Sequence, residues 1–79
     1  MQQEKVVHEF RKNSHEVVRA VIKTWNGRDL FDLRVYYETQ DGKIKPGPKG
    51  LCLRVEHLPE LKESLNKLDE EISQRGGKE

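Results

Sequence analysis

Basic and aromatic side chains alternate through the middle of this 79-residue chain. Lys23 and Trp25 are two residues apart, as are Arg34 and Tyr36, so each pair would share one face of an extended strand. Proteins bind single nucleic-acid strands with cations that contact phosphates and aromatic rings that stack on bases. The pattern therefore predicts a site for a single nucleic-acid strand. The alternative, that the large aromatic residues are core residues, remains open for Trp25.

The segment "QDGKIKPGPKG", residues 40–50, concentrates glycine, proline and lysine. Glycine and proline are typical of turns, but a turn does not require Lys43, Lys45 and Lys49. We interpret the segment as one wall of the site, which presents positive charge to a strand lying on a sheet. The prolines restrict the conformations of this segment in the unbound protein, which lowers the conformational entropy lost on binding.

Residues for covalent or metal chemistry lack the necessary spacing. His8, His15 and His57 show no metal-ligand spacing with each other or with Cys52. The glycine-rich segment also lacks the Lys-Ser/Thr ending of a phosphate-binding loop. We therefore expect no enzymatic activity, no catalytic residues, no metal site and no cofactor.

Four segments are predicted to be the strands that position these side chains: 5–11, 16–25, 30–38 and 51–55. Asn26-Gly27 indicates a tight hairpin turn between the second and third, because both residues tolerate positive φ. Residues 39–50 are expected to form a long connection. The third segment alternates, and the face expected to be buried consists of Phe31, Leu33, Val35 and Tyr37.

The apolar period changes from two to three and four near residue 56, which predicts one helix over about 56–74 and a frayed tail over 75–79. Its apolar stripe, which we expect at a dimer interface, consists of Leu58, Leu61, Leu65, Leu68 and Ile72. A stripe this narrow suits a helix that covers the sheet or one that faces a second copy of itself. Two-fold homodimers are the commonest oligomers, and a second copy would complete a thin core.

Length and composition indicate one small domain over residues 1–79, and the predicted strands and helix make it an α+β domain; the family resemblance described below sets its core at 17–55. Hydrophobic residues are 33% and charged residues 37% of the chain, so the core is thin for its length. A single cysteine and the lack of a secretion signal or membrane span predict a cytoplasmic, nucleoid-associated or nuclear protein. Residues 1–54 hold 11 Lys/Arg against 7 Asp/Glu, whereas residues 55–79 hold 4 against 7. This asymmetry hints at an anionic ligand on the first part.

The segment "WNGRDLFDLRVYYETQDGKIKPGPKGLCL" resembles the core of the positive-cofactor-four family of transcriptional coactivators. The resemblance covers about residues 17–72. It comprises an aromatic–x–Gly–basic hairpin beginning at Trp25, an apolar–Asp–apolar–Arg strand beginning at Phe31, and a Lys-Pro-Gly-x-Lys-Gly loop beginning at Lys45. A leucine-rich helix, "LPELKESLNKL", follows.

The resemblance implies a curved four-stranded antiparallel sheet, a C-terminal helix, a homodimer through the helices, and binding of single-stranded DNA or melted duplex. It assigns base stacking to Trp25 and Tyr37. The family's basic contacts to the DNA backbone match Lys23, Arg28, Arg34, Lys45 and Lys49. Tyr37 conflicts with the strand alternation, which places it with the apolar side chains and puts Tyr36 on the binding side.

The chain also departs from the family pattern. Asn26 stands where a lysine is usual and Pro48 where a basic residue is often found. Only 16 residues precede the core, in place of the long acidic regulatory region of the coactivators. We therefore predict a homodimeric, largely sequence-independent single-stranded DNA-binding protein that acts in transcription, or in replication and repair. The alternatives are a small dimeric protein-interaction module and a single-stranded RNA binder.

Overall fold

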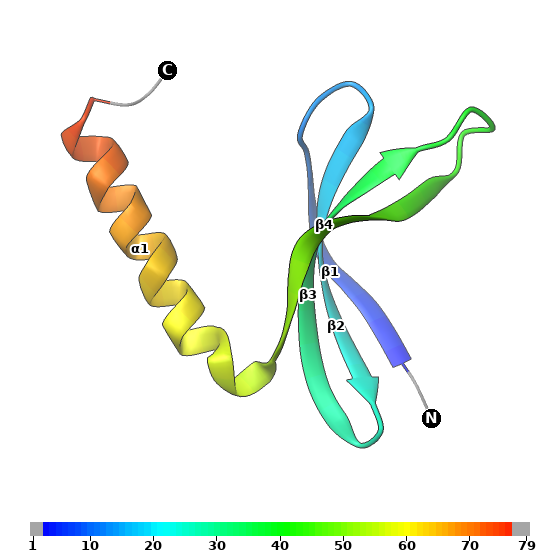
Figure 1. Ribbon diagram of the computed structural model, residues 1–79, viewed down its shortest axis with the longest axis horizontal. Helices are drawn as coiled ribbons and strands as arrows, with labels where there is room; N and C mark the ends of the chain where they lie inside the picture. The colour runs from blue at the N-terminus through cyan, green and yellow to red at the C-terminus, as the bar shows by residue number, and fades with distance from the viewer. Residues whose placement is uncertain (1–2, 77–79) are drawn as a thin grey trace.

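The computed structural model describes residues 3–76, which form a four-stranded antiparallel sheet followed by one helix (Figure 1). The strands are β1 (Gln3–Arg11), β2 (Glu16–Trp25), β3 (Arg28–Glu38) and β4 (Ile44–Arg54), and they lie side by side in chain order. A short 3₁₀ turn, η1 (Val55–His57), leads into α1 (Leu58–Gln74). The predicted architecture is confirmed. The tail expected to fray was 75–79: Arg75 and Gly76 form a turn whose backbone N–H groups donate to carbonyl groups at the end of α1, and residues 77–79 lie outside the described residues.

The turn between β2 and β3 sets the register of the sheet. Asn26 and Gly27 have φ of 53° and 73°, the left-handed values that a tight hairpin turn requires. The pairing continues from Trp25 opposite Arg28 to Glu16 opposite Tyr37 without a shift. Every side chain of β2 therefore has a fixed partner on the same face of β3.

β4 begins earlier than predicted. The sequence indicates a strand from Leu51, whereas β4 begins at Ile44 and includes Pro46 and Pro48. A proline is tolerated on an edge strand and at a bulge, because there its missing N–H breaks no ladder. β4 is such an edge, and its register shifts between Arg34 opposite Gly50 and Tyr36 opposite Pro46. The glycines and prolines thus form a bulged strand.

Gly50 allows β4 to approach β3 closely. A Cβ at Gly50 would lie 2.5 Å from the Leu33 carbonyl oxygen and 2.7 Å from the Arg34 Cα. Gly50→Ala should therefore lower the free energy of unfolding by about 1–3 kcal/mol, through overpacking. Thermal unfolding followed by circular dichroism measures this loss, at about 4–8 °C per kcal/mol for a domain of this size.

Gly42→Ala is the matched control for this prediction. Gly42 has φ of 85°, and a Cβ there would meet nothing within 4 Å, so alanine adds backbone strain without a collision. The Gly50 variant should be the less stable of the two. Equal losses would mean that the close approach of β4 to Arg34 is unimportant for stability.

The two faces of the sheet differ in burial. The most buried side chains, Val17, Val21 and Asp32, are 2–3% exposed, and the register places them on the face turned away from α1. On the face toward α1, Phe31, Leu33 and Val35 are only half-buried and Tyr37 is exposed. The prediction that these four side chains of β3 are buried is therefore wrong for the single chain, because α1 does not cover this face of the sheet.

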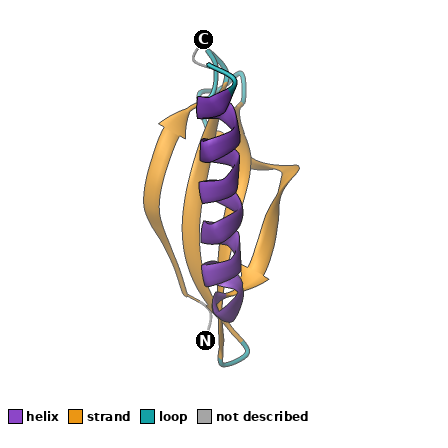
Figure 2. Cartoon of the chain, turned by 90° about the vertical axis from the view of Figure 1, so that its left-hand side faces the viewer, coloured by secondary structure: helices purple, strands orange, loops and turns teal. Residues whose placement is uncertain are grey.

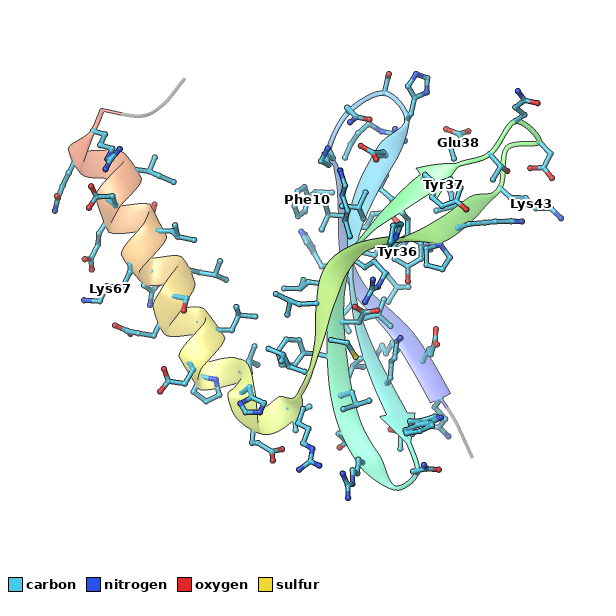
Figure 3. The ribbon with its side chains drawn as sticks, viewed as in Figure 1. Phe10, Tyr36, Tyr37, Glu38, Lys43 and Lys67 are labelled. Carbon is cyan, nitrogen blue, oxygen red and sulfur yellow. The ribbon has the colours of Figure 1, made fainter. Side chains whose placement is uncertain are left out.

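The helix runs lengthwise in front of the middle of the sheet (Figure 2). A cleft of about 260 Å³ separates the two, lined by sheet residues such as Phe31 and Leu33 and by helix residues such as Leu61 and Leu65. Leu58, Leu61 and Leu65 of the predicted stripe line this cleft. Four residues of the stripe remain 43–56% exposed: Leu58, Leu65, Leu68 and Ile72. Phe10 lies on the same side of the sheet (Figure 3) and is 54% exposed. A single chain thus leaves two facing apolar surfaces largely uncovered.

Candidate nucleic-acid interface

The face of the sheet turned away from α1 holds a cleft of about 490 Å³, lined by residues of all four strands such as Lys23, Asp32 and Arg34. We call residues 35–49, beyond the register shift, the β3–β4 arm; this arm and the first half of β1 both bend toward this side (Figure 1). We call this surface the cationic face, because the register of β2 and β3 aligns on it the residues Arg19, Lys23, Trp25, Arg28, Arg34 and Tyr36. Four predicted site residues, Lys23, Trp25, Arg28 and Arg34, are thus brought together.

Trp25 lies at the open end of this face. Its side chain is 48% exposed beside the hairpin turn, directly opposite Arg28 in the register. A cleft of about 310 Å³ adjoins it, and Lys23, Leu30 and Cys52 are among its lining residues. An exposed indole with cations on both strands is the arrangement that stacks a base and holds its phosphate.

The floor of the cationic face is a buried carboxylate between two cations. Asp32 is 2% exposed. Its oxygens accept hydrogen bonds from Arg34 Nε at 3.2 and 3.1 Å, and Lys23 Nζ lies 3.3 Å from Oδ2. Arg34 Nη1 also donates to the carbonyl oxygens of Gly47 and Pro48, at 3.2 and 3.3 Å. Arg34 therefore ties the floor to the bulge of β4.

Both cations remain protonated in this setting. Burial on its own would lower the pKa of Lys23, but the hydrogen bond and the negative charge of Asp32 outweigh it and raise the pKa. The hydrogen bond to Asp32 is also the main cause that raises the pKa of Arg34. Positive charge on the floor is thus retained throughout the physiological pH range.

Arg19 and Tyr36 also lie on this face, although the resemblance does not assign them to the site; for Tyr36 the strand alternation had predicted this side. The Arg19 guanidinium lies 4.8 Å from the centre of the Tyr36 ring, and its Nε donates to Glu9 of β1 at 2.6 Å. The signal was present in the sequence, because a turn at Asn26-Gly27 that pairs Trp25 with Arg28 also pairs Arg19 with Arg34.

Tyr37 lies on the opposite face from Tyr36. The bulge is in β4, so the alternation of β3 continues through both tyrosines (Figure 3). Tyr37 is 41% exposed and faces Lys45 in the register. Its ring passes over Gly47, where a Cβ would lie 3.6 Å from Cδ1. Tyr37 and Lys45 therefore form a separate pair on the arm, apart from Trp25.

The tip of the β3–β4 arm is ordered by hydrogen bonds of its own. The Thr39 hydroxyl donates to the Asp41 carboxylate, and the Lys43 amide donates to Thr39 Oγ1 at 3.3 Å. The hydrogen bond from Thr39 lowers the pKa of Asp41. The arm's lysines, Lys43, Lys45 and Lys49, are exposed, and among residues 3–76 none forms an ion pair. Their charge is available to a ligand.

Residues 3–76 contain neither a cluster of metal ligands nor a membrane-spanning helix. Within that range, no three His, Cys, Asp or Glu side chains gather as metal ligands would. Over the same residues, no helix has the length and apolar character needed to cross a bilayer.

Comparisons with known proteins identify relatives of this fold. The family described as Transcriptional Coactivator p15 (PC4) matches residues 12–64. The RNA polymerase II transcriptional coactivator KIWI of Arabidopsis thaliana is 33% identical over 55 residues, which are 70% of this chain and 50% of that protein. The chain thus spans about half the length of this curated relative.

Solved structures share the architecture. BPSL1147, a PC4 homolog from Burkholderia pseudomallei, superposes with a TM-score of 0.79 at 22% identity, over 85% of this chain and 98% of that one. MoSub1, solved as a complex with DNA, gives a TM-score of 0.63 at 24% identity, over 91% of this chain and 88% of that one. The motifs around Trp25, Arg34 and Lys45, the bulged sheet with its C-terminal helix, and these matches agree: the chain belongs to the PC4 family of transcriptional coactivators.

Proposed function

We propose that this protein binds single-stranded DNA across the cationic face, with little dependence on base sequence. The observation that carries the proposal is Trp25, half-exposed beside a cleft and flanked by Lys23 and Arg28. The relative MoSub1 was solved in complex with DNA, which supports DNA as the ligand. A protein-interaction function and an RNA-binding function are alternative outcomes of the binding experiment.

Binding would be non-covalent. Lysine and arginine side chains neutralise phosphates and release counterions, which makes affinity fall with salt. A base that stacks on an aromatic ring contributes roughly 1–3 kcal/mol, whatever its identity. We assign stacking to Trp25 and phosphate contacts to Lys23, Arg28, Arg34, Lys43, Lys45 and Lys49. Tyr37, beside Lys45, is the second aromatic contact for a DNA strand that passes over the arm.

The binding unit would be a homodimer. In one chain the stripe on α1 is largely exposed and the sheet face opposite it is only partly buried, and an apolar lining of this size is normally covered. A second copy supplies a matching helix, so two-fold pairing buries both stripes at once. Two cationic faces would then be available to one DNA molecule. A role in transcription, or in replication and repair, follows from single-strand binding of this kind.

The test is fluorescence anisotropy of a labelled 20-nucleotide oligo-dT at several salt concentrations, with duplex DNA and oligo-U as competitors. We expect salt-sensitive binding that duplex fails to displace. Replacing Lys45 and Lys49 together with alanine should make the slope of log affinity against log salt shallower by about 1.4, at about 0.7 for each phosphate that is no longer neutralised.

Lys62→Ala/Lys67→Ala is the matched control, since it removes the same charge from α1 and should leave the slope unchanged. Binding that does not respond to salt, or no binding at low salt, would overturn the proposal and favour a protein partner. Stronger competition by oligo-U than by oligo-dT would make RNA the ligand.

A further inference from the structure

Asp32 is the one charged side chain that folding buries almost completely within residues 3–76. It lies between Val21 of β2 and Cys52 of β4 in the register, at the centre of the cationic face. A carboxylate next to a surface that binds a polyanion should oppose binding, because like charges repel. Its position therefore requires a role that outweighs this repulsion.

The contacts of Asp32 lead to the β4 bulge through a single side chain. Asp32 holds the Nε edge of Arg34, and Arg34 Nη1 then holds the carbonyl oxygens of Gly47 and Pro48. The register pairs Arg34 with Gly50 and Tyr36 with Pro46, so residues 47–49 face Val35 without regular pairing. Hydrogen bonds from the Arg34 guanidinium thus take the place of the backbone hydrogen bonds that the bulge interrupts.

The bulge positions the arm that carries free positive charge. Lys45 and Lys49 flank the two carbonyl groups that Arg34 holds. The two floor cations, Lys23 and Arg34, are already paired with Asp32, whereas the lysines of the arm form no ion pair among residues 3–76. The surface therefore divides into a compensated floor and an uncompensated arm.

We propose that Asp32 is a positioning residue of the DNA-binding face. It acts through Arg34 to hold the β4 bulge and its lysines where they can bind the DNA strand. The inference rests on the proposed function, because it names what positions that same site. Asp32 itself does not contact DNA. Its carboxylate fixes the guanidinium in the one orientation that reaches both the floor and the bulge.

The sign of the effect separates positioning from simple electrostatics. If Asp32 only repels DNA, Asp32→Asn should tighten binding. If Asp32 positions the arm, the same variant should bind oligo-dT about tenfold more weakly, because a charged hydrogen-bond network is broken. The salt slope should not become shallower, since every cation remains. Anisotropy at several salt concentrations measures both quantities, at a temperature where circular dichroism shows the variant folded.

Glu9→Gln is the matched control. Glu9 is also a carboxylate on the cationic face, ion-paired to Arg19 at 2.6 Å, but its side chain is 44% exposed and it holds no part of β4. Its neutralisation should tighten binding by about 1.5- to 5-fold, the range for releasing an exposed ion pair. Opposite signs for the two carboxylates are the expected result.

A second variant keeps the proposal testable if Asp32→Asn does not fold. Arg34→Lys retains the positive charge but cannot reach Asp32 and both carbonyl groups at once. It should bind oligo-dT about tenfold more weakly with an unchanged salt slope. The double variant should be no weaker than the weaker single variant, because both substitutions break one network.

Amide hydrogen exchange of β4 tests the inference without DNA. Exchange at Gly47, Lys49 and Gly50 should speed up in Arg34→Lys and remain unchanged in Glu9→Gln. This result would stand even if the protein bound no oligonucleotide, so failure of the proposed function and failure of this inference are distinguishable. Tighter binding by Asp32→Asn, or unchanged exchange and affinity in Arg34→Lys, would overturn the positioning role.

Discussion

Replacing Trp25 with alanine is expected to weaken binding of oligo-dT by about 5- to 140-fold, equivalent to the loss of one stacked base at roughly 1–3 kcal/mol. The indole is 48% exposed at the end of the β2–β3 hairpin, so its removal leaves no internal cavity. The melting temperature should therefore change little. The salt slope should also be unchanged, because every cation that faces a phosphate remains. Anisotropy titrations with oligo-dT at several salt concentrations measure the affinity and the slope.

The conservative variant identifies the cause of this loss. Trp25→Phe keeps an aromatic face and should recover most of the affinity, whereas Trp25→Leu keeps apolar bulk and should not. Tyr36→Ala and Tyr37→Ala complete the series, since the two rings lie on opposite faces of β3. Full affinity in Trp25→Ala would remove this residue from the binding surface and return it to the role of an exposed hairpin residue.

The second large effect is expected at the helix. Leu65→Glu combined with Leu68→Glu places two carboxylates in the stripe of α1, whose leucines are 52% and 56% exposed in the single chain. Burial of a leucine at an interface stabilises by about 1.5–3 kcal/mol, and an unpaired charge there is far more unfavourable. The dissociation constant of the dimer should rise by about 100-fold or more. Sedimentation equilibrium over a range of concentrations measures it.

Lys67→Glu is the matched control, because it also changes the net charge by two. Lys67 lies on the side of α1 turned away from the sheet (Figure 3), where it is 68% exposed and pairs weakly with Glu63 at 3.8 Å. Its substitution should leave the dimer intact. Two variants that remained equally dimeric would falsify pairing through the stripe, and a wild-type protein that sediments as a monomer at all concentrations would do the same.

Short-range patterns in the sequence predicted the elements well. The positive φ that Asn26-Gly27 tolerates identified the hairpin, and the change of apolar period near residue 56 identified the helix. Both signals depend only on residues that are close together in the sequence. The start of β4 was missed for the complementary reason, since proline and glycine indicate a loop unless the strand lies at an edge and contains a bulge.

For the candidate site too, local patterns could be predicted from the sequence, whereas contacts between distant segments could not. Alternation along β2 and β3 placed Lys23 with Trp25 and Arg34 with Tyr36, and the hairpin aligned the two pairs. No pattern in the sequence indicated that Asp32 would be the most buried charged group, or that Arg34 would reach the carbonyl groups of Gly47 and Pro48. Those hydrogen bonds join residues 13 and 14 positions apart across a bulge.

By itself, then, the sequence determined the order of four strands and one helix, the β2–β3 register, and the cations and aromatic residues that make up the proposed binding surface. Only the tertiary structure decided which cations are paired with a carboxylate and how the arm is held to the floor of the cationic face. Turn conformation and side-chain alternation are local properties of the chain. Burial and ion pairing depend on which distant segment lies alongside, and curvature and the bulge of β4 set that arrangement here.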